Sequence, residues 1–134
     1  MKTIWNRVHE KAPLVHAITN YVTINDCANI VLASGASPIM AEAPEEVAEI
    51  SSRSQGLLLN LGMLRSDKLE AMILAGQAAN KRGIPVVLDP VGVGASAFRM
   101  NSVRRLLHEV SCSVIRGNAS EILSLCQVGS SQGV

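Results

Sequence analysis

VVLDPVGVG, residues 86–94, is the most informative stretch about the fold of this 134-residue sequence, and VIRGNASE at residues 114–121 has the same form. Each is an apolar run that ends at a charged residue and then passes through small residues into a helix-like segment. This pattern is typical of a strand in a parallel sheet followed by its crossover helix. Because open α/β folds bind ligands at the carboxyl ends of such strands, we expect Asp89, Arg116 and Glu121 to lie on one functional edge.

The rest of the chain alternates in the same way, which predicts an α/β fold with a mostly parallel sheet flanked by helices, built from about five βα units. Thr23 with Asp26 predicts a capping box before a helix over 24–34, and Pro44 predicts the first position of the next helix. Residues 127–134 are rich in Gly and Ser and predict a loop. We expect strands over residues 14–18, 37–40, 57–61, 84–88 and 112–115.

The composition indicates a compact globular protein, because 48% of the residues are hydrophobic and only 17% are charged. Twelve basic and eleven acidic side chains give a net charge of +1, which provides no electrostatic reason to expect nucleic acid or a membrane surface as a partner. No apolar run reaches the roughly 18 residues of a membrane-spanning helix, and the N-terminus has no apolar signal core. The expected location is the cytoplasm.

Two carboxylates and a guanidinium on one edge suit a metal-bound polyphosphate better than a neutral ligand. Taken singly, each residue has an ordinary structural interpretation. Asp89 before Pro90 can terminate a strand, Glu121 can be a solvated acid in the first turn of a helix, and Arg116 can be a surface charge. A dinucleotide-binding fingerprint is disfavoured because the third glycine is missing, and no glycine-lysine phosphate loop of the Walker type is present.

Four motifs in order resemble the hydroxyethylthiazole kinase family of thiamine salvage: PLVHAITNYV, ASGASPIMAEAPEE, LDPVGVGA and IRGNASEI. The resemblance implies a ribokinase-like fold and ATP-dependent phosphorylation of 4-methyl-5-(2-hydroxyethyl)thiazole. It also implies magnesium at Asp89 and Glu121, ATP at Arg116, and the thiazole alcohol at Asn20 and Met40. Members of the family are homotrimers with the thiazole site between subunits, so a homotrimer is implied for a complete protein.

The resemblance extends from about Pro13 to the last predicted helix, and the chain reaches Val134 roughly where the family is half finished. We therefore expect residues 1–134 to be the N-terminal portion of a single ribokinase-like kinase domain. The family's G-[TA]-G-C anion-hole loop lies beyond this portion, so we assign no catalytic residue here and expect the isolated chain to be inactive. Two alternatives are a non-catalytic truncated fragment and a kinase of the same fold acting on another small alcohol, such as a pyrimidine or pyridoxal.

Overall fold

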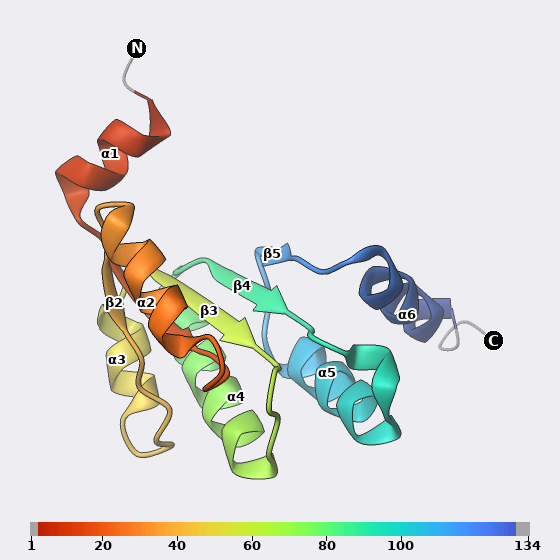
Figure 1. Cartoon of the computed structure of the whole chain (residues 1–134). Helices are drawn as coiled ribbons and strands as arrows, with labels where there is room; N and C mark the ends of the chain where they lie inside the picture. The colour runs from red at the N-terminus through yellow and green to blue at the C-terminus, as the bar shows by residue number, and fades with distance from the viewer. Residues whose placement is uncertain (1–2, 131–134) are drawn as a thin grey trace.

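The computed structural model describes residues 3–130 and folds them around a five-stranded parallel sheet with the strand order β2-β1-β3-β4-β5 (Figure 1). The predicted α/β class is confirmed. In chain order the elements are α1 (Ile4–Lys11), β1 (Leu14–Ile18), α2 (Ile24–Ala33), β2 (Ser37–Ile39), α3 (Val47–Arg53), β3 (Gly56–Asn60), α4 (Ser66–Lys81), β4 (Val86–Asp89), η1 (Val93–Ala95), α5 (Ala97–Glu109), β5 (Val114–Ile115) and α6 (Ala119–Ser130).

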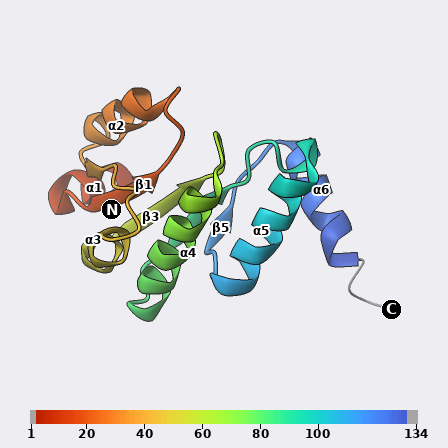
Figure 2. The same ribbon diagram turned by 90° about the horizontal axis from the view of Figure 1, so that it is seen from below.

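The order of the strands reverses direction once. From β1 the chain runs outward to β2, then returns past β1 to β3 and continues to β4 and β5. The helices α3, α4 and α5 lie side by side on one side of the sheet, and α2 lies on the other side (Figure 2). The carboxyl ends of β1 and β3 therefore flank a topological switch point, which is where open α/β sheets bind their ligands.

The core lies between the sheet and α4. Leu57, Leu59 and Leu88 point from the strands into it and are at most 2% exposed. The buried stripe of α4 includes Gly76, where a Cβ would lie 2.5 Å from a methyl carbon of Val110, so α4 and the end of α5 pack at close range. None of the helices formed by residues 3–130 is both long and apolar enough to span a membrane.

Two local predictions at helix starts are wrong. The side chain of Thr23 makes no capping bond to α2; its backbone N–H and its hydroxyl both donate to Oδ1 of Asn20 instead, at 3.1 Å. The turn before α2 is thus organised by the residue that follows β1. Pro44 lies in a turn that precedes α3, and the helix begins three residues later at Val47.

The predictions for the two ends of the chain also need correction. No helix was predicted over Ile4–Lys11, where the structure places α1; its start is capped by Thr3, whose hydroxyl accepts from the N–H of Asn6, and it buries none of its side chains. At the other end, α6 continues to Ser130 rather than giving way to a loop after Cys126. The rest of the predicted loop, residues 131–134, lies outside the described residues.

Candidate functional site

The candidate site is built at the carboxyl ends of four neighbouring strands. Asn20 follows β1, Asn60 ends β3, Asp89 ends β4 and Arg116 follows β5. In the parallel register Asn60 and Asp89 are direct partners, so their side chains leave adjacent strands at the same level. Strands β3, β4 and β5 are apolar up to the polar residue at their carboxyl end, and the four strands run parallel. Residues as far apart in the sequence as Asn20 and Arg116 therefore lie on one edge of the sheet.

Asp89 and Arg116 form an ion pair in which Nη1 of Arg116 lies 2.8 Å from Oδ2 of Asp89. The carboxylate is largely buried, with its side chain 12% exposed, whereas the guanidinium is 76% exposed. The largely buried Asp89 thus binds one N–H group of Arg116, and the other N–H groups of the exposed guanidinium face solvent. A planar guanidinium placed in this way has donors left for a phosphate group.

Glu121 is joined to the same edge through the loop after β4. Its Oε1 accepts from the N–H of Gly92 at 3.0 Å, and its Oε2 accepts from the N–H of Asn118 at 2.9 Å. Asn118 and Glu121 are joined by a second, reciprocal hydrogen bond, in which Oδ1 of Asn118 accepts from the N–H of Glu121. These two backbone hydrogen bonds lower the pKa of Glu121, and the nearby charge of Arg116 adds to the effect. The residue is therefore an ionised acid that also caps α6.

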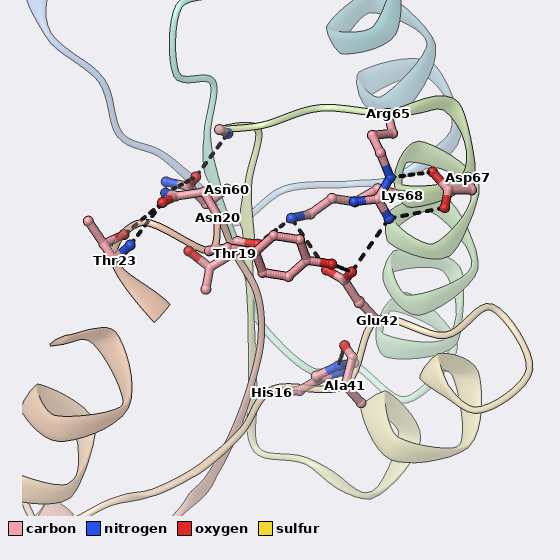
Figure 3. A network of polar contacts seen from close by, with 12 residues as sticks. His16, Thr19, Asn20, Thr23, Ala41, Glu42, Asn60, Arg65, Asp67 and Lys68 are labelled. Atoms are coloured by element: carbon pink, nitrogen blue, oxygen red, sulfur yellow. Dashed lines mark hydrogen bonds and ion pairs between the residues drawn. The ribbon is translucent and has the colours of Figure 1, made fainter. Parts of the chain in front are cut away.

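Asn60 connects the two ends of the site, and sequence reasoning missed it. Its Nδ2 donates to Oδ2 of Asp89 at 3.1 Å, while its Oδ1 accepts from Nδ2 of Asn20 at 3.1 Å and from the N–H of Gly62 at 2.9 Å. The backbone N–H of Gly62 can only donate and the carboxylate of Asp89 can only accept. These two partners therefore fix which end of the Asn60 amide is oxygen and which is nitrogen. Figure 3 shows Asn20 and Asn60 facing each other beside Thr23. A signal was available: an amide at the end of a leucine-rich strand.

Gly62 and Arg99 shape the loops around these side chains. A Cβ on Gly62 would lie 2.9 Å from both the Cβ of Asn20 and Oδ1 of Asn60, so the backbone there packs directly against both amides. Arg99, from α5, donates through Nη1 to the carbonyl oxygens of Leu61 and Val91 at 2.7 and 2.8 Å. One guanidinium thus links the loop after β3 to the loop after β4.

Met40 lies directly after β2, half-buried, at the same edge of the sheet. The structure thus places all five predicted site residues at strand ends or at the helix start that follows β5. It joins four of them: Asp89 pairs with Arg116, Asn20 reaches Asp89 through Asn60, and Glu121 holds the loop that follows Asp89. Met40 stands apart from this hydrogen-bonded group, since a thioether offers only a weak acceptor.

The acids fit a magnesium ion that keeps most of its ligands from water and phosphate. Within residues 3–130, Oδ1 of Asp89 accepts no hydrogen bond, and each oxygen of Glu121 accepts only one, which leaves lone pairs on hard oxygen donors. No cluster of three or more His, Cys, Asp or Glu side chains in the described part of the chain could hold a metal by itself. Magnesium is commonly bound through one or two carboxylates together with substrate phosphates, so this donor set is compatible with it.

Comparisons with known proteins agree on one family. A model described as the hydroxyethylthiazole kinase family matches residues 5–134. A protein named hydroxyethylthiazole kinase from Alkaliphilus metalliredigens is 55% identical over 119 residues, covering 89% of this chain and 44% of its own length. One from Clostridium beijerinckii is 55% identical over 128 residues, covering 96% and 46% respectively.

The structural comparison gives the same result. The solved structure of a hydroxyethylthiazole kinase protein from Pyrococcus horikoshii OT3 matches with a TM-score of 0.90 and 41% sequence identity. The match covers 96% of this chain and 50% of that chain. The chain therefore spans about half the length of the relatives that it matches.

Proposed function

This chain belongs to the hydroxyethylthiazole kinase family, and we propose that the full-length gene product transfers the γ-phosphoryl group of ATP to the primary hydroxyl of 4-methyl-5-(2-hydroxyethyl)thiazole. The observation that carries the proposal is the hydrogen-bonded series from Asn20 through Asn60 to Asp89 and Arg116. It joins a candidate alcohol-binding end to a candidate phosphate-binding end along one sheet edge. Phosphoryl transfer depends mainly on such relative positioning and on charge stabilisation.

The phosphate end is formed by Arg116, Asp89 and Glu121. Arg116 binds phosphate oxygens of ATP through the donors that its pair with Asp89 leaves free. Asp89 and Glu121 hold the magnesium ion, which when bound neutralises phosphate charge and orients the polyphosphate. Asp89 also fixes the orientation of Arg116, and Glu121 fixes the loop that follows β4 through the N–H of Gly92.

The alcohol end is formed by Asn20 and Met40. The Oδ1 of Asn20 accepts from the backbone N–H and the hydroxyl of Thr23, and one N–H of its Nδ2 donates to Asn60. The second N–H of Nδ2 remains to donate to a hydroxyl oxygen or a ring nitrogen of the substrate. Met40 offers a flexible, polarizable surface for a sulfur heterocycle. These two assignments follow the family motifs. The position of Asn20 after β1, beside the switch point, and of Met40 after the neighbouring strand β2 supports them.

The family also suggests a setting for the reaction. We propose that residues 1–134 form part of one ribokinase-like domain, that the complete protein is a homotrimer, and that it serves thiamine biosynthesis or salvage in the cytoplasm. No nucleic acid or membrane partner is proposed, since the net charge of +1 gives neither an electrostatic attraction. The partners are the thiazole alcohol, ATP and further copies of the chain.

The test is a substrate panel on the full-length gene product. Purified protein is incubated with ATP and magnesium and with the thiazole alcohol, a hydroxymethylpyrimidine or pyridoxal, and the phosphorylated product is identified by mass spectrometry. We expect the thiazole alcohol to give the highest kcat/KM. A preference for the pyrimidine or pyridoxal would replace the substrate assignment, and failure to phosphorylate any of the three would overturn the proposed activity.

A further inference from the structure

A buried lysine lies beneath the two loops that carry Asn20 and Met40. Lys68, in the first turn of α4, is 1% exposed, and its side chain is completely buried. Its ammonium group donates to the carbonyl oxygen of Thr19 and lies 3.4 Å from Oε2 of Glu42. The ring of Tyr21 covers it, with the ring centroid 5.2 Å from Nζ. We call Lys68, Glu42 and Tyr21 the lysine cluster.

Glu42 completes the lysine cluster as an ionised partner. The hydroxyl of Tyr21 donates to its Oε1, and Arg65 lies 3.6 Å from the same oxygen. Partial burial raises the pKa of Glu42, but the hydrogen bond from Tyr21 and the charge of Lys68 outweigh it, so the pKa of Glu42 is lowered overall. The cluster therefore joins three segments of the chain: the loop after β1, the loop after β2 and the start of α4.

The contacts of the cluster fall next to the candidate substrate residues. Thr19, whose carbonyl Lys68 holds, directly precedes Asn20, and Glu42 comes two residues after Met40. The loop after β2 has a second anchor, because Nε2 of His16 lies 2.8 Å from the carbonyl oxygen of Ala41. Since β2 ends at Ile39, no strand pairing places Met40, and these side chains define its position instead.

Stability alone does not account for a charged residue at this position. Burying an ammonium group has a large desolvation cost, and replacing buried ion pairs by apolar side chains of similar size is often neutral or stabilising. From these contacts we infer that Lys68 is a positioning residue, which sets the distance between Asn20 and Met40 and so shapes the thiazole-binding end of the site. This inference rests on the proposed function for its substrate.

The test compares Lys68→Met with Lys81→Met in the full-length gene product. Lys68→Met keeps the length of the side chain and removes its charge and donors, whereas Lys81 is exposed in the last turn of the same helix. Loss of a charge-assisted hydrogen bond predicts that Lys68→Met raises the KM for the thiazole alcohol about tenfold while the KM for ATP changes less than about twofold. Lys81→Met should leave both KM values unchanged. Equal effects on both substrates, or none, would overturn the inference.

A second variant separates positioning from folding. Lys68→Met leaves Glu42 without its buried cation, so Lys68→Met combined with Glu42→Gln should recover thermal stability. If the KM for the thiazole alcohol remains raised in the double variant although its thermal stability has recovered, the positioning role holds. If the KM returns to the wild-type value together with stability, Lys68 acts only through folding and the inference is wrong.

Amide hydrogen exchange gives a readout that needs no substrate. In Lys68→Met we expect faster exchange over residues 19–23 and 40–43 and unchanged exchange over residues 89–92 and 116–121. If the wild-type protein does not phosphorylate the thiazole alcohol while Lys68→Met exchanges faster only in these two loops, the proposed function is wrong and the positioning role still holds. Unchanged exchange in the two loops, or a rise along the whole edge, would overturn the positioning role whatever the substrate.

Discussion

Replacing Asn60 with aspartate changes one atom of the edge network: the amide nitrogen that donates to Asp89 becomes a carboxylate oxygen. The other half of the side chain keeps its partners, because its Oδ1 still accepts from Asn20 and Gly62. The new carboxylate oxygen faces Oδ2 of Asp89 at the former donor–acceptor distance of 3.1 Å. A stabilising hydrogen bond is thus replaced by repulsion between two like charges in a largely buried position.

The magnitude follows from this geometry. Two unit charges at 3.1 Å repel by about 5 kcal/mol at an effective dielectric constant of 20. Arg116, which is bound to the same oxygen of Asp89, also attracts the new carboxylate and so offsets part of this repulsion; we therefore expect a loss of about 2–3 kcal/mol in the free energy of unfolding at pH 8. Two facing carboxylates share a proton once the pH approaches the raised pKa of the pair. Because that pKa is higher in the folded than in the unfolded chain, the loss shrinks as the pH falls.

The assay is urea unfolding of the full-length gene product at pH 8 and at pH 5, with metal and nucleotide absent. Asn60→Ala provides the uncharged comparison: it removes the hydrogen bonds without adding charge, so its loss of about 1–3 kcal/mol should not depend on pH. Asn101→Asp, at an exposed position of α5, is the control for adding a carboxylate and should change stability by less than about 0.5 kcal/mol. If Asn60→Asp destabilised the protein equally at both pH values, Asn60 and Asp89 would not be in contact as described.

The remaining predictions concern three separate parts of the molecule. Arg116→Ala should weaken ATP binding by about ten- to a hundredfold in a calorimetric titration, since charge-assisted hydrogen bonds to phosphate are lost, and an unchanged Kd would remove Arg116 from the site. Burial lowers the pKa of His16, so its contribution to stability is full above about pH 6.5 and is lost as the pH falls; His16→Gln should flatten the fall in unfolding free energy between about pH 7 and 5, and an unaltered slope would contradict this. Gly76→Ala should destabilise the protein by about 1–3 kcal/mol through contact with Val110, and adding Val110→Ala should recover part of the loss, which a double-mutant cycle measures.

Most of the fold could be predicted because the strands, and the helices from α2 onward, carry their own local signals. The run that forms β4 is apolar up to Asp89, and β1 lies over the same residues, 14–18, that were predicted for it. Predictions were wrong where a tertiary contact replaced a local one. Thr23 has the right residue type and spacing for a cap, but Asn20 satisfies its N–H and hydroxyl first, and a sequence pattern does not contain that competition.

The edge residues were predictable for a related reason, and the links between them were not. Asp89 and Arg116 each follow an apolar run, so their arrival at one edge follows from a parallel sheet. Their ion pair depends on the strand order, which places β4 beside β5. Asn60 lies next to Asp89 because β3 pairs with β4 in a register that no local pattern encodes. Glu121 serves as a helix cap and lies at the edge, so the two interpretations of its sequence position are compatible.

Lys68 shows most clearly what a sequence leaves open. A lysine in the first turn of a helix is ordinarily solvated, and the positive end of the helix dipole disfavours a cation there. Two groups from distant segments reverse this expectation, since the Thr19 carbonyl accepts a hydrogen bond and Glu42 supplies the opposite charge. Neither group is a neighbour of Lys68 in the chain, and both belong to the loops that follow β1 and β2. A residue at an intrinsically unfavourable position is retained only where its partners compensate for it, and here these partners flank Asn20 and Met40. The burial of Lys68 is therefore most simply explained by what it holds in place.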